Sequence, residues 1–132
     1  MEIAKEQLLH GDLTEKIIGC AFDVHNALGK GLSEKTYENA LLLRMQKVGL
    51  TAEQQKAIPI FFENQKVGNQ VVDILVEDKI ILEIKNSDHI QRSHTAQMLG
   101  YLKNTRYQLG LILNFGRRVE FKRLIHTIQN KT

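Results

Sequence analysis

The chain has 132 residues, of which 42% are hydrophobic and 25% are charged, and its formal net charge is +3. This length suits one domain with its own core, and the composition excludes a wholly disordered chain. The single cysteine, Cys20, excludes an intramolecular disulfide and a cysteine-based zinc cluster. No apolar run reaches the roughly 20 residues of a membrane span, and the first residues lack a signal-peptide core, so we predict a cytoplasmic protein.

A first amphipathic helix is predicted over residues 13–28, where apolar residues recur at helical spacing. Asp12 and Glu15 stand in the capping-box pattern at its start. We interpret residues 1–11 as an N-terminal extension in front of this helix.

A second helix is predicted between Ser33, which can cap its first turn, and Gly49, which occupies the stop position. Glu34 and Glu38 fall on the same stripe of this helix as its apolar residues. Glutamate in a first helical turn also interacts favourably with the helix dipole, so Glu34 has two interpretations, electrostatic and functional. Glu38, deeper in the apolar stripe, fits the electrostatic interpretation less well.

From residue 57 the apolar pattern changes to the alternation typical of strands. The predicted elements are strands at 57–62, 70–77 and 79–85 with a polar turn at 63–69, a helix capped by Ser93, and strands at 109–115 and 119–127. The run 109–115 is apolar on both faces, which indicates an interior strand covered by helices. The resulting order, ααβββαββ, predicts an α/β sandwich with a mixed sheet.

Two acids and a lysine interrupt the most apolar hairpin of the chain, at Asp73, Glu83 and Lys85. Burying an unpaired carboxylate costs several kcal/mol, so such residues need partners. One interpretation is that the three charges satisfy one another as a closed ion-pair network. The other is a functional site.

The length of the hairpin loop decides between two arrangements of these residues. With a two-residue turn at Asp78 and Lys79, Glu83 points away from Asp73. With a three-residue loop, or an equivalent bulge, Asp73 lies opposite Glu83, Lys85 shares their face, and the Cβ atoms of the two acids are roughly 5 Å apart. The functional interpretation therefore predicts the three-residue loop.

Two carboxylates this close repel each other unless a cation lies between them, and oxygen ligands suit Mg²⁺ or Mn²⁺. Such an ion acts as a Lewis acid and lowers the pKa of bound water, while a nearby lysine orients the nucleophile or neutralises charge on phosphorus. Asp73, Glu83 and Lys85 together therefore indicate metal-dependent phosphodiester hydrolysis.

At these residues the sequence resembles the PD-(D/E)xK nuclease superfamily, with Asp73 as the first acid and residues 83–85 as the (D/E)xK element. Val72 stands where the motif has proline. The chain also resembles the GxxExxY family of small prokaryotic proteins, whose motif corresponds to residues 31–37. The similarity extends over about residues 12–126.

The resemblance implies a restriction-endonuclease-like three-layer sandwich in a single domain, residues 12–128. It implies that Glu34 or Glu38 adds a further acid and that Gln97 lies beside the metal site. Gln97 and Tyr101, four residues apart, share a helical face. Tyr37 of the GxxExxY motif is better interpreted as a packing residue than as a catalytic one.

We therefore predict a metal-dependent nuclease, or a domain derived from one, that acts on DNA. Its predicted catalytic residues are Asp73, Glu83, Lys85, Glu38, Glu34 and Gln97, and its predicted metal ligands are Asp73, Glu83 and Ile84. The alternative is a non-catalytic nucleic-acid-binding or protein-interaction module that keeps the fold. No insertion for reading DNA sequence is evident, so specificity is expected from a partner, a homodimer or the structure of the substrate. Six basic residues near the end of the chain are candidates for phosphate contacts, with a solvated surface as the rival interpretation: Lys103, Arg106, Arg117, Arg118, Lys122 and Arg123.

Overall fold

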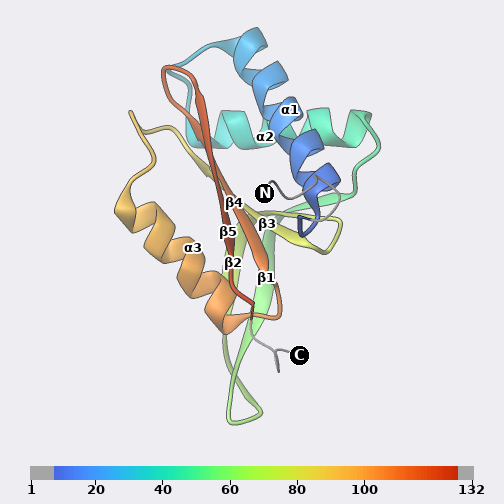
Figure 1. Ribbon diagram of the computed structural model, residues 1–132, viewed down its shortest axis with the longest axis vertical. Helices are drawn as coiled ribbons and strands as arrows, with labels where there is room; N and C mark the ends of the chain where they lie inside the picture. Colours follow the sequence, from blue (N-terminus) through green and yellow to red (C-terminus); the bar gives the residue numbers. More distant parts are fainter. Residues whose placement is uncertain (1–7, 128–132) are drawn as a thin grey trace, which may run out of the picture.

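The computed structural model describes residues 8–127, which form three helices and five strands (Figure 1). The elements are α1 (Gly11–Leu28), α2 (Glu34–Lys47), β1 (Ala52–Phe62), β2 (Gln65–Val76), β3 (Ile80–Lys85), α3 (Arg92–Asn104), β4 (Leu109–Phe115) and β5 (Val119–Ile125). The order ααβββαββ expected from the sequence is confirmed. Most of the proposed N-terminal extension, and residue 128 at the proposed domain end, lie outside the described residues.

The five strands form one sheet in the order β1-β2-β3-β4-β5, in which only β3 and β4 run parallel. Parallel neighbours need a crossover connection, and α3 provides it. All seven residues of β4 are buried, as its continuous apolar run predicts. The sheet is therefore mixed.

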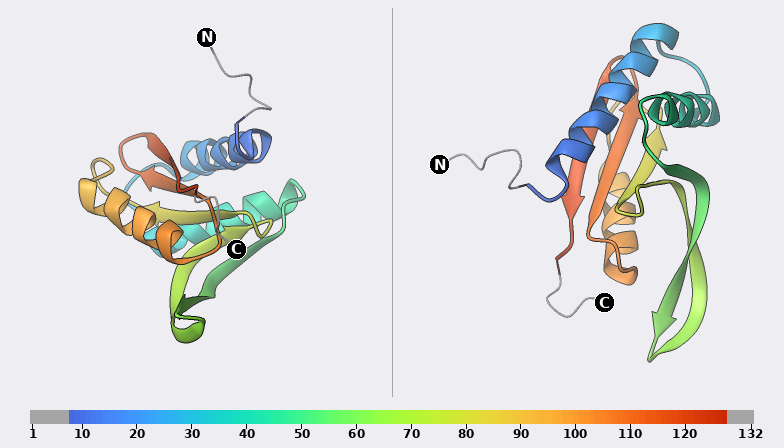
Figure 2. Two further views of the ribbon diagram at one scale, coloured as in Figure 1. Left: turned by 60° about the horizontal axis from the view of Figure 1, so that its bottom comes forward. Right: turned by 90° about the vertical axis from the view of Figure 1, so that its right-hand side faces the viewer.

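Helices cover both faces of the sheet, which gives three layers (Figure 2). On one face, α1 contacts β4 and β5 and α2 contacts β1, β2 and β3, whereas α3 packs on the other face against β4 and β5. Each face has its own apolar cluster. We call them the α1/α2-side cluster, which contains Ile17, Leu41, Leu82 and Leu111, and the α3-side cluster, which contains Met98 and Ile112. None of the described helices is both long and apolar enough to span a membrane.

The ends of α2 match the sequence prediction. The side chain of Ser33 accepts a hydrogen bond of 3.2 Å from the Thr36 N–H. Gly49 follows the helix with φ +90°, a left-handed value that glycine adopts without steric cost. The N–H of Leu50 then donates to the Met45 carbonyl at 2.9 Å, which closes the last turn.

The predicted starts of α1 and α3 are wrong. α1 begins at Gly11 after His10, so Asp12 lies within the first turn, where its charge favours the helix dipole, and is not the cap. α3 begins at Arg92, because the Gln91 N–H donates to Nδ1 of His94 at 3.0 Å. Ser93 therefore lies inside the first turn of α3.

The polar segment 63–69 is not a turn as predicted, because most of it continues β2. Only Glu63 and Asn64 form the turn, with φ +50° and +64°, and the strands pair from there back to the sheet. Since β2 pairs with β3 only from Ile74 onward, residues 57–71 form a two-stranded hairpin that projects beyond the sheet (Figures 1 and 2). We call residues 57–71 the arm.

Candidate active site at the diverging ends of two strands

The β2–β3 loop has three residues, 77–79, because Val76 pairs directly with Ile80. Glu77 and Asp78 have φ values of +53° and +51°, and the Lys79 N–H donates to the Val76 carbonyl at 2.9 Å. This is the loop length that the functional interpretation of the hairpin requires. Continuing the register from Ile74 opposite Leu82 places Asp73 opposite Glu83.

From this pair onward, carboxylate side chains take the place of backbone carbonyls as hydrogen-bond acceptors between β2 and β3. The Asp73 N–H donates to Oε2 of Glu83 at 2.9 Å, and the Ile84 N–H donates to Oδ2 of Asp73 at 2.8 Å. Each acid is therefore fixed by a backbone group of the opposite strand. These bonds hold the two strands together where they begin to separate.

The closed ion-pair network does not form between these residues. Lys85 donates from Nζ to Oε1 of Gln97 at 3.2 Å. In the part of the chain that the structure describes, no ion pair joins Lys85 to Asp73 or Glu83.

An irregularity in β1 and β2 opens the sheet at Asp73. Val72 belongs to the α3-side cluster and Ile74 to the α1/α2-side cluster, although residues two apart on a regular strand share a face. In β1, Gln55 stands opposite Asp73 with φ +49° and is absent from the pairing that joins its neighbours to β2. One residue on each strand lies between the flanking pairs, so the irregularity contains no inserted residue, yet Val72 and Ile74 face opposite sides of the sheet.

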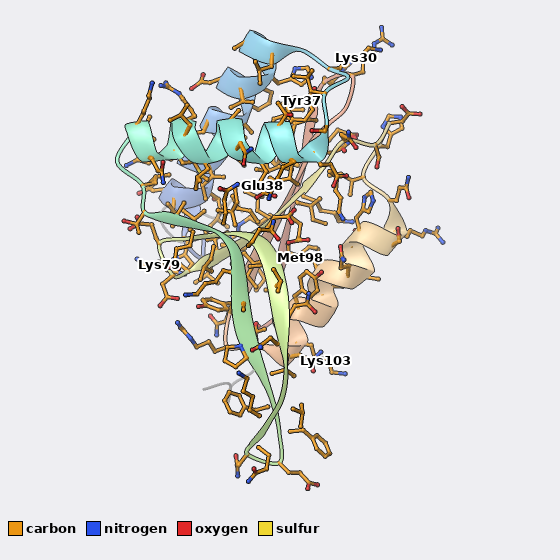
Figure 3. All side chains as sticks on the ribbon, turned by 180° about the vertical axis from the view of Figure 1, so that it is seen from behind. Lys30, Tyr37, Glu38, Lys79, Met98 and Lys103 are labelled. Carbon is orange, nitrogen blue, oxygen red and sulfur yellow. The ribbon has the colours of Figure 1, made fainter. Side chains whose placement is uncertain are left out.

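Glu38 points from α2 toward this part of the sheet (Figure 3). It is buried, and its carboxylate accepts hydrogen bonds from Lys35 Nζ at 3.1 Å, from Gln54 Nε2 at 2.7 Å and from Gln55 Nε2 at 3.1 Å. The Gln55 amide also contacts the Asp73 carboxylate. Gln55 therefore connects the helix acid to the strand acid.

The two candidate helix acids have different environments. Glu38 is 4% exposed, and its charge acts on both Asp73 and Glu83. Glu34 is exposed in the first turn of α2. The structure thus brings Glu38 to the strand acids and leaves Glu34 at the surface.

The carboxylates of the strand pair resist ionisation. Burial, then the charge of Asp73, and to a smaller degree the charge of Glu38, raise the pKa of Glu83 to about 7. Burial is also the main reason that the pKa of Asp73 is raised, and the hydrogen bond from Ile84 opposes that shift.

Two residues of α3 face the acid pair. Gln97 binds Lys85, as described above, and Tyr101 is half-buried. Burial and the charges of Glu83 and Asp73 raise the pKa of Tyr101 to about 12. The helical face that carries Gln97 and Tyr101 therefore lies beside the acids.

Tyr37 is a packing residue. Its ring is buried and stacks on Phe115, with ring centroids 4.6 Å apart and an interplanar angle of 7°. Its hydroxyl donates to the Gly29 carbonyl at 2.6 Å and accepts from the Leu32 N–H at 3.2 Å. Tyr37 thus holds the loop between α1 and α2 in place.

Two of the basic residues proposed for phosphate contacts bind groups within the protein. Arg106 donates to both carboxylate oxygens of Asp78 at 2.7 Å and lies over the ring of Tyr107. Arg123 donates to the Leu9 carbonyl. Some of the hydrogen-bond donors of Arg106 and Arg123 are therefore already bound to groups of the protein.

A metal ion would find oxygen ligands but no large cluster here. Within residues 8–127, no three His, Cys, Asp or Glu side chains are grouped so as to hold a metal. Asp73 and Glu83 supply two carboxylates; burial raises the pKa of both, and nearby negative charge raises each further, from Glu38 at Asp73 and from Asp73 at Glu83. A hard divalent cation relieves such repulsion, so the donor chemistry of this pair fits Mg²⁺ or Mn²⁺.

Sequence reasoning missed Lys35, Gln54 and Gln55. Lys35 is three residues before Glu38 on a helix, a spacing that predicts their contact. The glutamines gave no such signal, because their contacts depend on the positive φ of Gln55 and on the packing of α2 over β1.

No curated protein matches the chain. The crystal structure of SSO0001 is similar with 16% identity, 91% of this chain and 81% of that chain covered, and a TM-score of 0.49. An alkaline exonuclease from Laribacter hongkongensis, LHK-Exo, is similar with 13% identity, 86% and 82% covered, and a TM-score of 0.46.

A family model described as the PD-(D/E)XK nuclease superfamily matches residues 11–124. It does not test the narrower resemblance to the GxxExxY family, which stays a prediction. The matched segment contains all three layers, and their architecture is the restriction-endonuclease-like fold. Because the match covers most of the length of the chain, the chain belongs to the PD-(D/E)XK nuclease superfamily.

Proposed function

We propose that the protein is a metal-dependent nuclease that hydrolyses phosphodiester bonds in DNA. The observation that carries this proposal is the pair Asp73 and Glu83, opposite each other on strands that separate, with a raised pKa at both carboxyl groups. Groups with perturbed pKa values gather at functional sites. Membership of a nuclease superfamily agrees with this chemistry.

In this proposal Asp73, Glu83 and the carbonyl of Ile84 hold Mg²⁺ or Mn²⁺. A divalent cation bound there supplies a Lewis acid that activates water and neutralises charge on the phosphate. Glu38, rather than the exposed Glu34, is the helix acid, because it is buried and reaches Asp73 through Gln55.

Lys85 and Gln97 act as a unit beside the acids. The hydrogen bond from Lys85 Nζ to Gln97 Oε1 holds the ammonium group on the α3 side of the sheet. From there the charge of Lys85 stabilises the negative charge that develops on the phosphoryl oxygens. Gln97 keeps its amide N–H groups for a phosphate oxygen or for water.

The proposal is tested by comparing the wild-type protein with Asp73→Asn on single-stranded, duplex and branched DNA in the presence of Mg²⁺ or Mn²⁺. Asparagine keeps an oxygen that can accept the Ile84 N–H, so the hairpin is retained while the charge is lost. We expect metal-dependent cleavage by the wild type and a decrease of about 100-fold or more in the variant.

Asp23→Asn is the matched control, because Asp23 pairs with Arg44 on the exposed surface of α1. This control is expected to cleave as the wild type does. Cleavage that persists in EDTA, or equal cleavage by Asp73→Asn, would refute the proposal. DNA binding without cleavage under any metal would instead favour the alternative, a non-catalytic nucleic-acid-binding module.

A further inference from the structure

The tip of the arm exposes large apolar side chains on a ribbon of only two strands. Phe61 is 61% exposed, Phe62 65% and Val67 60%. A two-stranded hairpin without a covering layer is marginally stable in water, and clustered apolar groups at a surface indicate a binding site. The exposed side chains at the tip therefore indicate a surface that binds another molecule.

The backbone fixes the shape of this tip. The two-residue turn at Glu63 and Asn64 closes the hairpin, with Phe62 paired to Gln65 and Phe61 to Lys66. The register shifts after Ile60, so Val67 forms a bulge. Phe61 and Phe62 are successive strand residues and point to opposite faces of the ribbon.

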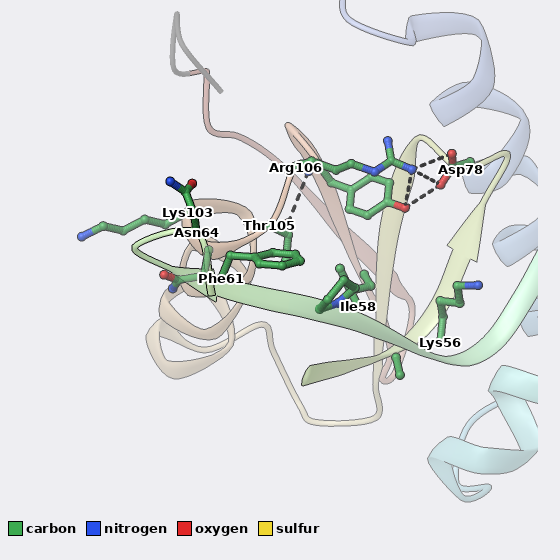
Figure 4. Close-up of a pocket in the computed structure, with 12 residues that line it drawn as sticks. Lys56, Ile58, Phe61, Asn64, Asp78, Lys103, Thr105 and Arg106 are labelled. Atoms are coloured by element: carbon green, nitrogen blue, oxygen red, sulfur yellow. Dashed lines mark hydrogen bonds and ion pairs between the residues drawn. The ribbon is translucent and has the colours of Figure 1, made fainter. Parts of the chain in front are cut away.

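Two adjoining pockets lie along α3, one beside Gln97 and Tyr101 and one at this tip. A pocket of about 300 Å³ lies between the arm and α3, and its lining includes Gln97 and Tyr101, the two residues beside the acids, together with Asn104. Asn104 also lines the adjacent pocket of about 690 Å³, which contains Phe61 (Figure 4). We call these two pockets the groove; they share Asn104, and together their linings extend from Gln97 and Tyr101 to Phe61.

The lining of the groove suits a polynucleotide better than a second protein. Amide side chains (Asn64, Gln70 and Asn104) occur along it, and Lys56 and Lys103 line the larger pocket. Amides hydrogen-bond base edges and lysines contact phosphates, whereas an interface with another protein is depleted of lysine at its centre. Exposed phenylalanine rings are platforms on which unpaired bases stack.

We propose that this groove binds an unpaired DNA strand, one base of which stacks on Phe61, the phenylalanine that lines the groove. Bases inside a duplex are already stacked, so the arm selects DNA that has a single-stranded segment, such as an overhang, a flap or a junction. The identity of the strand as substrate rests on the proposed nuclease function, but its binding does not.

Binding is measured in EDTA, where cleavage is suppressed, by fluorescence anisotropy of a single-stranded oligonucleotide. We expect the double variant Phe61→Ala/Phe62→Ala to lose at least about tenfold in affinity. Phe121→Ala is the matched control, because Phe121 is 49% exposed on β5 and outside the groove. Its affinity is expected to equal that of the wild type. Circular dichroism verifies that all variants are folded.

A second readout reports stacking directly. An oligonucleotide that contains 2-aminopurine is expected to change its fluorescence on binding to the wild type and to Phe121→Ala, and not on binding to the double variant. Unchanged affinity and fluorescence in the double variant would overturn the inference, as would a preference of the wild type for blunt duplex.

Sedimentation separates the remaining outcomes. A wild-type dimer that the double variant converts to monomer without loss of DNA affinity would assign the arm to self-association and overturn the inference. Cleavage and binding fail independently: no cleavage with intact, arm-dependent binding refutes only the nuclease function. Cleavage with binding that does not depend on the arm refutes only this inference.

Discussion

At the scale of single residues, Glu83 couples the site to the stability of the fold. Only 5% of its surface is exposed, and its pKa of about 7 lies above the ordinary value of 4.5. The unfolded chain therefore releases this proton at lower pH than the folded one. Between about pH 4.5 and 7 the folded state binds more protons, so its stability falls as the pH rises.

We predict that, without divalent metal, the free energy of unfolding decreases by up to about 3 kcal/mol from pH 4.5 to pH 7.5 through this group. The raised pKa of Asp73 acts in the same direction. Urea unfolding across this pH range measures the effect, and Glu83→Gln should flatten the curve. Glu63→Gln, at the exposed turn of the arm, is the control and should leave the slope unchanged. Parallel curves for the wild type and Glu83→Gln would contradict the prediction.

At the scale of elements, the turn between β4 and β5 is fitted against the segment that follows β3. Asn114 is fully buried, donates to the Ser87 carbonyl at 2.9 Å and accepts from the Ser87 N–H at 2.9 Å. A Cβ atom at Gly116 would lie 2.6 Å from the same Ser87 carbonyl oxygen. Either the turn or the segment would have to move to admit it.

We predict that Gly116→Ala lowers the free energy of unfolding by about 1–3 kcal/mol, as overpacking against a backbone atom does. Gly19→Ala on α1 is the contrasting variant, because nothing lies within 4 Å of its added Cβ atom. That change should stabilise the protein by about 0.5–1 kcal/mol, since alanine favours a helix. Chemical denaturation measures both, and equal stability of the two variants would contradict this account.

The sequence predicts an element well where the residues that determine its two ends lie within the element or directly beside it. The strand at 109–115 is predicted to the residue because it is apolar on both faces, and α2 is bounded by Ser33 and Gly49. The starts of α1 and α3 depend on His10 and Gln91, which are not the residues that the capping patterns at Asp12 and Ser93 indicate. The sequence prediction leaves residues 65–69 out of β2, because four of these five residues are polar or glycine and show no alternation of apolar with polar side chains.

The same distinction applies to the candidate site. The spacing of Asp73 and Glu83 and the parity of the loop predict their facing positions, because hairpin geometry relates register to loop length. Gln55 could not be predicted, since it reaches Asp73 through a left-handed backbone conformation unusual for glutamine. The choice of Glu38 over Glu34 required the burial that only the packed helix shows.

At the scale of the whole molecule, the sheet contributes side chains to the two apolar clusters, one on each of its faces. Leu111 and Ile112 are consecutive on β4 and fully buried, but Leu111 packs on the α1/α2 side and Ile112 on the α3 side. The two helical layers are therefore joined through one strand. A single domain over residues 12–128 should unfold as one unit.

We predict that Leu111→Ala and Ile112→Ala each lower the free energy of unfolding by about 2–5 kcal/mol while leaving one cooperative transition. Circular dichroism and tyrosine fluorescence should give coincident curves. Leu43→Ala, at a side chain that is 55% exposed on α2, should stay within about 0.5 kcal/mol of the wild type. Separate transitions for the two variants would divide the chain into two folding units.

The hydrogen bonds that Asp73 and Glu83 accept from the backbone have a consequence for reading related sequences. These side chains are part of the seam between β2 and β3, so natural selection for folding alone retains an oxygen acceptor at each position. A descendant that had lost catalysis would keep the same spacing of acids, or the corresponding amides. Under the proposed nuclease function, an amide at either position therefore marks the loss of catalysis in an intact fold, whereas the acids by themselves mark only the fold.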